Sequence, residues 1–182
     1  MPRSRGTDAV SDRLSLGRVA VLHTAVLAAF LVVASMDDIW PLRVVYNASA
    51  SVPLGWYSVS EPEALEPGDY VVVRPPIKVE ELLVERGYLG SGVPLVKQIG
   101  AGPGATVCRH DGAISINGTP AALARDADTL GRSLPHWSGC RRVERSEVFL
   151  LNSGSPGSFD GRYFGPSPAR DIIGKAHPLW TW

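Results

Sequence analysis

The sequence predicts a mainly β fold, in which an antiparallel β domain follows one N-terminal transmembrane helix. Glycine and proline together supply 34 of the 182 residues, 19 and 15 respectively, and this content favours turns and short strands over long helices. Short apolar and β-branched runs recur between turn signals along residues 37–182. One uncharged apolar stretch, residues 19–36, precedes them. These observations together predict a β domain tethered to a membrane.

The apolar stretch has the length of a membrane span. As a helix, its 18 residues would extend roughly 27 Å at about 1.5 Å per residue, close to the ~30 Å hydrocarbon core. Four arginines precede it and only Arg43 follows within the next 18 positions. The positive-inside rule therefore predicts a cytoplasmic tail over 1–18, an anchor over 19–36 and a domain across the membrane over 37–182. A cleaved signal peptide and a buried helix of a soluble domain are the alternatives.

Six short runs predict strands in the C-terminal domain: residues 70–73, 95–99, 106–110, 113–116, 148–151 and 172–173. Asp111-Gly112 is a strong signal for a two-residue hairpin turn, and Asn117-Gly118 repeats it. Apolar residues that share a helical face predict one short helix over 79–86, ended by Gly87. Residues 121–146 are polar and irregular, which predicts a loop-rich insertion.

Charge and motif content exclude several classes of function. Lys+Arg and Asp+Glu are 18 each, so the net charge is zero, and no nucleic-acid partner is expected. Zinc-ligand spacings, glycine-rich phosphate loops and dinucleotide fingerprints do not occur, so neither a metal nor a cofactor is expected. A Ser-His-Asp triad is not excluded, because its members come from distant positions, but nothing local favours it.

Two segments carry candidate catalytic groups. Ser51 lies two residues before Pro53 in a stretch biased to extended or turn geometry; the alternative is a serine-rich loop. Lys97 is flanked by Val96 and Ile99. An apolar environment would lower the pKa of its amine, and a neutral amine can act as a general base near neutral pH. The alternative is a strand lysine that faces outward.

A third segment, residues 151–165, combines polar groups, aromatic residues and the pair Asp160 and Arg162 in one glycine-rich loop. Its alternative interpretation is a surface turn with an ion pair of little energetic value.

The order of these features is more specific than any one of them. The apolar span is followed by Ser-x-Pro-x-Gly-x-Tyr, Gly-Asp-Tyr-Val-Val-Val, a lysine ahead of Gly-x-Gly-Pro-Gly, and Ser-x-Asp-x-Arg-Tyr-Phe-Gly. From Leu16 to the C-terminus this resembles the signal peptidase superfamily of Ser/Lys proteases. Four segments resemble its TraF branch, the peptidases of conjugative transfer systems: residues 53–57, 131–140, 158–166 and 174–180.

The resemblance implies three catalytic residues. Ser51 matches the nucleophile, Lys97 the lysine base and Asp160 an acidic residue that TraF peptidases also need. Gln98 and Ala105 stand where general signal peptidases usually have Arg and Asp, but these positions flank the base without supplying its chemistry. The Ser-x-Pro spacing, in place of Ser-Met-x-Pro, favours the TraF branch.

The resemblance also implies three supporting residues. Ser158 and Arg162 match positions that support the lysine and its loop. Ser49 matches the position of a hydroxyl that joins the Ser51 backbone N–H in the oxyanion hole.

A signal-peptidase-like β domain and a function follow as expectations from the resemblance. The chain is expected to be a serine endopeptidase of the bacterial inner membrane, with a cytoplasmic N-terminus and a periplasmic catalytic domain. The expected substrate is the pilin precursor of a conjugative (type IV secretion) system, hydrolysed or cyclised through an acyl-enzyme. The lipid bilayer and other conjugation-channel proteins are further expected partners. The alternatives are a general signal peptidase I acting on secretory precursors, and a non-catalytic anchored β module of the secretion apparatus.

The two cysteines, Cys108 and Cys140, lie 32 positions apart. In an oxidising periplasm they are expected to form a disulfide, and two buried free thiols are the alternative.

Overall fold

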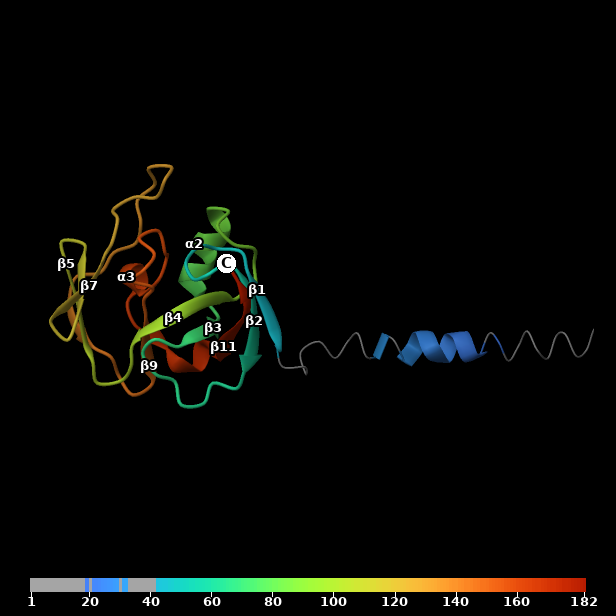
Figure 1. Ribbon diagram of the computed structural model, residues 1–182. Coiled ribbons are helices and arrows are strands. Elements are labelled where there is room, and N and C mark those ends of the chain that lie inside the picture. Colours follow the sequence, from blue (N-terminus) through green and yellow to red (C-terminus); the bar gives the residue numbers. More distant parts are fainter. Residues whose placement is uncertain (1–18, 20, 30, 33–41) are drawn as a thin grey trace, which may run out of the picture. The chain divides into compact units, whose positions relative to one another are not determined.

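The computed structural model describes residues 19, 21–29, 31–32 and 42–182 (Figure 1). The described residues before residue 33 are helical. Among all described residues, no helix combines the length and the apolar character needed to cross a bilayer. The predicted tail, and residues 20, 30 and 33–36 of the predicted anchor, lie outside the described residues. The transmembrane anchor therefore stays a prediction.

Residues 42–182 form two sheets in which paired strands are antiparallel, so the prediction of a mainly antiparallel β domain is confirmed. The larger sheet has the strand order β1-β2-β11-β3-β4-β9-β10. Its strands are β1 Val44–Asn47, β2 Gly55–Ser60, β3 Tyr70–Val73, β4 Leu95–Ala101, β9 Glu147–Leu150, β10 Ser167–Pro168 and β11 Ile172–Thr181. The smaller sheet has the order β7-β6-β5-β8 and stands beside the larger one (Figure 1). Its strands are β5 Thr106–His110, β6 Ala113–Ile116, β7 Thr119–Leu123 and β8 Gly139–Arg142.

The core consists of three apolar clusters set by strand alternation. On β3, successive valines face opposite sides of the sheet, so Val72 belongs to one cluster and Val71 to another. The third cluster joins the two sheets, because Val107 of β5 packs in the same group as Phe149 of β9. The larger sheet is thus covered on both faces around β3 and β4, and β4 is the strand that carries Lys97.

Local sequence signals located several elements well. β3, β5 and β6 have the predicted bounds, and Asp111 and Gly112 join β5 to β6 with φ values of 48° and 81°, as a primed hairpin turn requires. The predicted helix is confirmed as α2, Ile77–Glu85. Two further short helical segments follow, α3 Gly161–Phe164 and the 3₁₀ turn η1 Ala169–Asp171.

The prediction of an irregular insertion over 121–146 is wrong in part. The end of β7 and all of β8 lie within it, and Ala127 bridges to Ser133. Both strands are edges of the smaller sheet and are largely exposed, so they lack the apolar alternation by which a strand is detected. Pairing with neighbouring strands, rather than local pattern, makes these residues extended.

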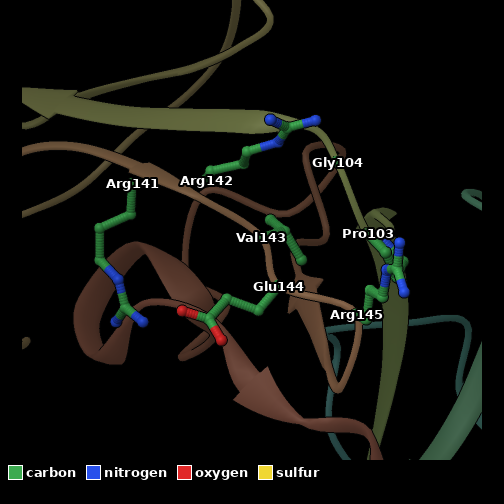
Figure 2. Close-up of a pocket in the computed structure, with 7 residues that line it drawn as sticks. All are labelled: Pro103, Gly104, Arg141, Arg142, Val143, Glu144 and Arg145. Atoms are coloured by element: carbon green, nitrogen blue, oxygen red, sulfur yellow. The ribbon is translucent and has the colours of Figure 1, made fainter.

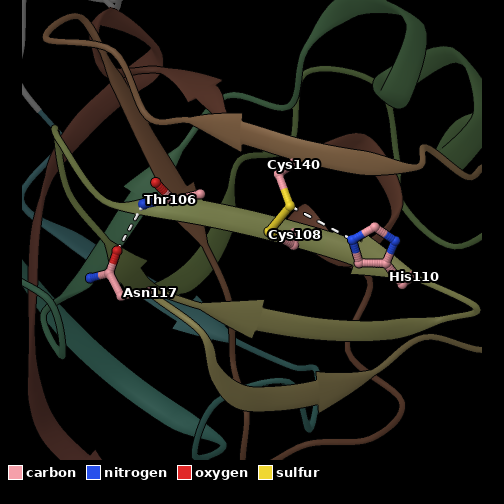
Figure 3. The surroundings of a disulfide bond; sticks show 5 residues. All are labelled: Thr106, Cys108, His110, Asn117 and Cys140. Carbon is pink, nitrogen blue, oxygen red and sulfur yellow. Dashed lines mark hydrogen bonds between the residues drawn. A yellow bond between two sulfur atoms is a disulfide. The ribbon is translucent and has the colours of Figure 1, made fainter.

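Cys108 and Cys140 face each other across β5 and β8 and are disulfide-bonded (Figure 3). His110 Nε2 lies 3.6 Å from Cys140 Sγ, and the ligating atoms of the three residues lie within 4.8 Å of one another. Because both sulfurs are joined to each other, they do not offer the thiolates that bind a metal. The bond fastens β8 to the centre of the smaller sheet.

Candidate active site

The predicted nucleophile and the predicted base, but not Asp160, line an apolar pocket of about 390 Å³. Ser51 reaches it from the loop between β1 and β2, Lys97 from β4, and Ser158 from the segment before α3. All three are buried, with exposed fractions of 7%, 4% and 2%. The rest of the lining is mostly apolar and includes Leu83, Leu89, Leu95, Leu134, Phe159 and Tyr163. The tertiary fold therefore gathers polar groups from distant parts of the chain in one largely apolar pocket.

Lys97 is an inward-facing strand residue, so the alternative of an outward-facing lysine is wrong. It pairs with Val71 of β3, and its amine donates a hydrogen bond to Ser158 Oγ at 3.5 Å. Burial lowers the pKa of Lys97 from 10.5 to about 8. The negative charge of Asp160 opposes this shift, and the positive charge of Arg162 adds to it. A substantial fraction of the amine is therefore neutral at mildly alkaline pH.

Ser51 hydrogen-bonds to Ser49, not to Lys97. The two serine Oγ atoms are 2.9 Å apart. The described residues include no hydrogen bond between Ser51 and Lys97, although both line the same pocket. Catalytic hydrogen bonds in free enzymes are often long and shorten only when substrate binds. The serine and the lysine thus share one pocket but are not hydrogen-bonded to each other.

Ser49, which the resemblance predicts to be an oxyanion donor, is hydrogen-bonded to Asn47 in the free chain. Its hydroxyl donates to Asn47 Oδ1 at 3.0 Å. A serine hydroxyl carries one hydrogen, so Ser49 would have to release Asn47 before it could donate to an oxyanion.

Asp160 and Arg162 form a completely buried ion pair, so the surface-turn alternative is wrong. Both side chains are 0% exposed, and Arg162 Nε lies 2.8 Å from Asp160 Oδ1 while Nη2 lies 3.1 Å from Oδ2. The Arg162 guanidinium also donates to backbone carbonyls on both sides: Leu123 of β7, and Asn152, Ser155 and Pro156. This pair therefore ties the loop before α3 to the smaller sheet.

The sequence did not reveal α3 because the helix is one turn long and begins with glycine. Gly161 is required there, since a Cβ atom would lie 2.6 Å from the Leu150 carbonyl oxygen and 2.8 Å from the Phe149 ring. Asp160 caps this helix by accepting from the Arg162 backbone N–H at 3.2 Å. The close approach to β9 brings Asp160 near Lys97.

Replacing Arg162 by methionine is expected to lower the free energy of unfolding by about 3–5 kcal/mol, because it leaves Asp160 buried without its partner. Arg170 is the matched control, since it is 86% exposed and lies 4.0 Å from Asp171. Arg170→Met should change stability by no more than about 0.5 kcal/mol. Urea unfolding of the full chain in detergent, followed by tryptophan fluorescence, measures both. Equal small losses would contradict a charged, paired Asp160.

One wall of the pocket is held by a polar cluster that sequence analysis missed. Tyr88, which follows α2, donates a hydrogen bond to Asp128. Arg132 Nε lies 2.7 Å from Asp128 Oδ2, and its guanidinium lies 5.2 Å from the Tyr88 ring centre. These contacts hold the pKa of the Asp128 carboxyl far below its usual value, with the Tyr88 hydrogen bond as the largest cause. The cluster joins two segments that line the pocket from different parts of the chain.

A second hollow, of about 780 Å³, is not part of this site. Arg141, Arg142 and Arg145 line it together with the turn at Pro103 and Gly104. Figure 2 shows the three arginine side chains pointing in different directions, and Arg141 lies 3.1 Å from Glu147. The arginines do not converge on a shared anion position.

Asn47 is the other site residue that sequence analysis left without a role. Its side chain makes hydrogen bonds throughout the loop that carries Ser51. An asparagine two residues before Ser49 has the spacing of an Asx turn, and that signal could have found it.

The chain matches the family described as "Signal peptidase, peptidase S26" over residues 16–182. "Plasmid transfer protein TraF" of Escherichia coli is 35% identical over 146 residues, covering 75% of this chain and 82% of that protein. "Conjugal transfer protein TraF" of Agrobacterium fabrum is 35% identical over 147 residues, covering 75% and 81%. A signal peptidase I structure from Enterococcus faecalis has a TM-score of 0.36 and 19% identity, covering 63% of this chain and 98% of that chain.

Proposed function

Because the chain belongs to the signal peptidase S26 family, as its motif order predicted, we propose that it is a membrane-anchored serine endopeptidase using Ser51 and Lys97. Its proposed task is to mature the pilin precursor of a conjugative transfer system. The observation that carries the catalytic assignment is the pocket in which a buried lysine with a lowered pKa and a buried serine occur together. Such a lysine can accept a proton without another base.

The proposed reaction begins with proton transfer from Ser51 Oγ to the neutral amine of Lys97. Ser51 Oγ then bonds to the substrate carbonyl carbon. The Ser51 backbone N–H stabilises the oxyanion, and the Ser49 hydroxyl joins it by turning its hydrogen from Asn47 Oδ1 to the oxyanion. As the peptide bond breaks, the Lys97 ammonium returns the proton to the leaving amine. The product is an ester between Ser51 and the N-terminal part of the substrate.

The remaining polar residues position the base. Ser158 accepts a hydrogen bond from Lys97, which aims the amine within the pocket. Asp160 favours the ammonium electrostatically, and so it stabilises the form of Lys97 that arises during the attack. Arg162 keeps Asp160 in its place through two parallel hydrogen bonds.

The substrate assignment is supported by the names of the relatives, which are plasmid and conjugal transfer proteins. The ester has two fates. Water releases a shortened pilin, whereas the free amino terminus of the same acyl chain releases a cyclic one. Both routes return the Ser51 hydroxyl, so the mass of the product distinguishes them.

The proposed location is the periplasmic face of the inner membrane. Aromatic side chains on the β1-β2-β11 side of the larger sheet support contact with the lipid interface: Tyr46, Trp56, Trp180 and Trp182, which are 45%, 46%, 72% and 65% exposed. Aromatic residues are enriched at this depth of a bilayer.

Co-expression with candidate precursors tests this function. The chain should shorten or cyclise a pilin precursor and leave a generic secretory precursor intact, as seen by mass spectrometry of membrane fractions. Processing of the secretory precursor alone would favour a general signal peptidase I. Processing of neither, together with normal conjugation by a Ser51→Ala strain, would favour a non-catalytic module and overturn the proposal.

A further inference from the structure

Building on the proposed function, we infer that Asn47 is a positioning residue for the catalytic serine. Its side chain fixes Ser49 and, through Ser49, the direction of the Ser51 hydroxyl. Asn47 is the last residue of β1 and is 5% exposed. It does not line the pocket, so its effect on catalysis would be transmitted through the serines.

The amide nitrogen of Asn47 holds the backbone of the nucleophile loop. Nδ2 lies 2.7 Å from the carbonyl oxygen of Ser49, 3.1 Å from that of Val52 and 3.0 Å from that of Pro53. These acceptors lie on both sides of Ser51 in sequence. One side chain thereby sets the curvature of the loop around the nucleophile.

The amide oxygen of Asn47 holds Ser49. Oδ1 accepts from the Ser49 backbone N–H at 3.2 Å and from the Ser49 hydroxyl at 3.0 Å. A flipped amide would place its oxygen against three carbonyl oxygens and its amino group against an N–H donor. The neighbouring groups therefore determine which amide atom faces Ser49.

This arrangement settles which serine donates in the pair of hydroxyls 2.9 Å apart. The single hydroxyl hydrogen of Ser49 goes to Asn47, so Ser49 can only accept from Ser51. The result is a directed chain from Ser51 to Ser49 to Asn47. Ser51 must turn its hydrogen from Ser49 toward Lys97 before attack, and Asn47 fixes the position from which that rotation starts.

A double-mutant cycle tests whether Asn47 acts through Ser49. Asn47→Ala should lower kcat for a pilin-precursor peptide about 10- to 100-fold and leave KM within about twofold, since Asn47 lies outside the pocket. The double variant Asn47→Ala/Ser49→Ala should be no slower than Ser49→Ala by more than about twofold. The inference would be overturned if the kcat losses of the two single variants multiplied in the double variant. It would also be overturned if Asn47→Ala lowered kcat by less than about threefold.

Tyr57→Phe is the matched control, because Tyr57 lies on β2 but its hydroxyl supports the same loop. The Tyr57 hydroxyl donates to the Pro53 carbonyl oxygen at 2.7 Å, the same acceptor that Asn47 uses. Removing it weakens the loop without touching the serine hydroxyls. Tyr57→Phe should lower kcat only slightly. In the double variant Tyr57→Phe/Ser49→Ala, the two kcat losses should multiply. A loss as large and as non-additive as that of Asn47→Ala would show general loop support instead of positioning.

Asn47→Asp keeps the inference testable if the alanine variant does not fold. A carboxylate keeps the acceptor for Ser49 and loses the donors to the three carbonyls. The kcat of Asn47→Asp should stay within about tenfold of wild type, because Ser49 keeps its acceptor. Its melting temperature should fall, because the loop loses three hydrogen bonds. A kcat loss beyond about 100-fold in folded Asn47→Asp would contradict the inference. If Ser51→Ala still cleaves, the proposed function itself fails, whatever Asn47 does.

Discussion

Ser51→Ala is expected to lower kcat/KM for precursor cleavage by at least about 10³-fold, because it removes the atom that forms the acyl-enzyme. The variant should still fold. Among the described residues, Ser51 Oγ makes one hydrogen bond, to Ser49, and losing such a bond costs only about 1 kcal/mol. Single-turnover cleavage of a pilin-precursor peptide, with trapping of the serine ester by mass spectrometry, measures the loss.

Ser58→Ala is the control for this prediction. Ser58 lies on β2, outside the pocket, and pairs with Val44 in the sheet. It should retain wild-type cleavage and still form the ester. If Ser51→Ala cleaves at a rate similar to Ser58→Ala, another group is the nucleophile.

Lys97→Met is expected to change activity and stability in opposite directions. Cleavage should fall about 10²- to 10⁴-fold, since the general base is lost. At pH 7 the variant should be more stable than wild type by up to about 3 kcal/mol, because methionine fills the apolar site without a buried charge.

The pH dependence of this stability difference follows from the lowered pKa of Lys97, about 8 in the folded chain against 10.5 normally. Between these values the unfolded chain binds more protons, so the free energy of unfolding of the wild type rises with pH. The advantage of Lys97→Met is full below pH 8, shrinks above it and disappears near pH 10.5. Urea unfolding of both proteins at pH 7 and pH 10.5 tests this. Taking the difference between the two free energies of unfolding at each pH removes the effects of alkaline pH that both proteins share.

Wild-type kcat/KM should rise with pH through an ionisation near pH 8, because only the neutral amine accepts the Ser51 proton. An ascending limb that begins only near pH 10.5, or a stability difference that does not vary with pH, would contradict a buried base.

Local chemistry explains which parts of the fold were predictable. The β5-β6 hairpin was located because Asp111-Gly112 adopts the positive φ values of its turn, whatever the rest of the chain does. β8 was missed because its residues are mostly exposed at a sheet edge and became extended through pairing with β5. α3 was missed because one glycine-initiated turn has no periodic pattern, and its shape depends on close packing against β9.

The sequence by itself determined the family and the antiparallel β class and predicted the serine and the lysine of the site, because motif order and turn chemistry are properties of the linear chain. Tertiary structure decided how these groups relate to their surroundings. It turned Lys97 inward, enclosed Asp160 and Arg162 completely, and directed the Ser51 hydroxyl to Ser49 instead of the lysine. The reason is physical: burial, and with it a pKa or a hydrogen-bond direction, is set by neighbours from distant strands and loops, which no local pattern specifies.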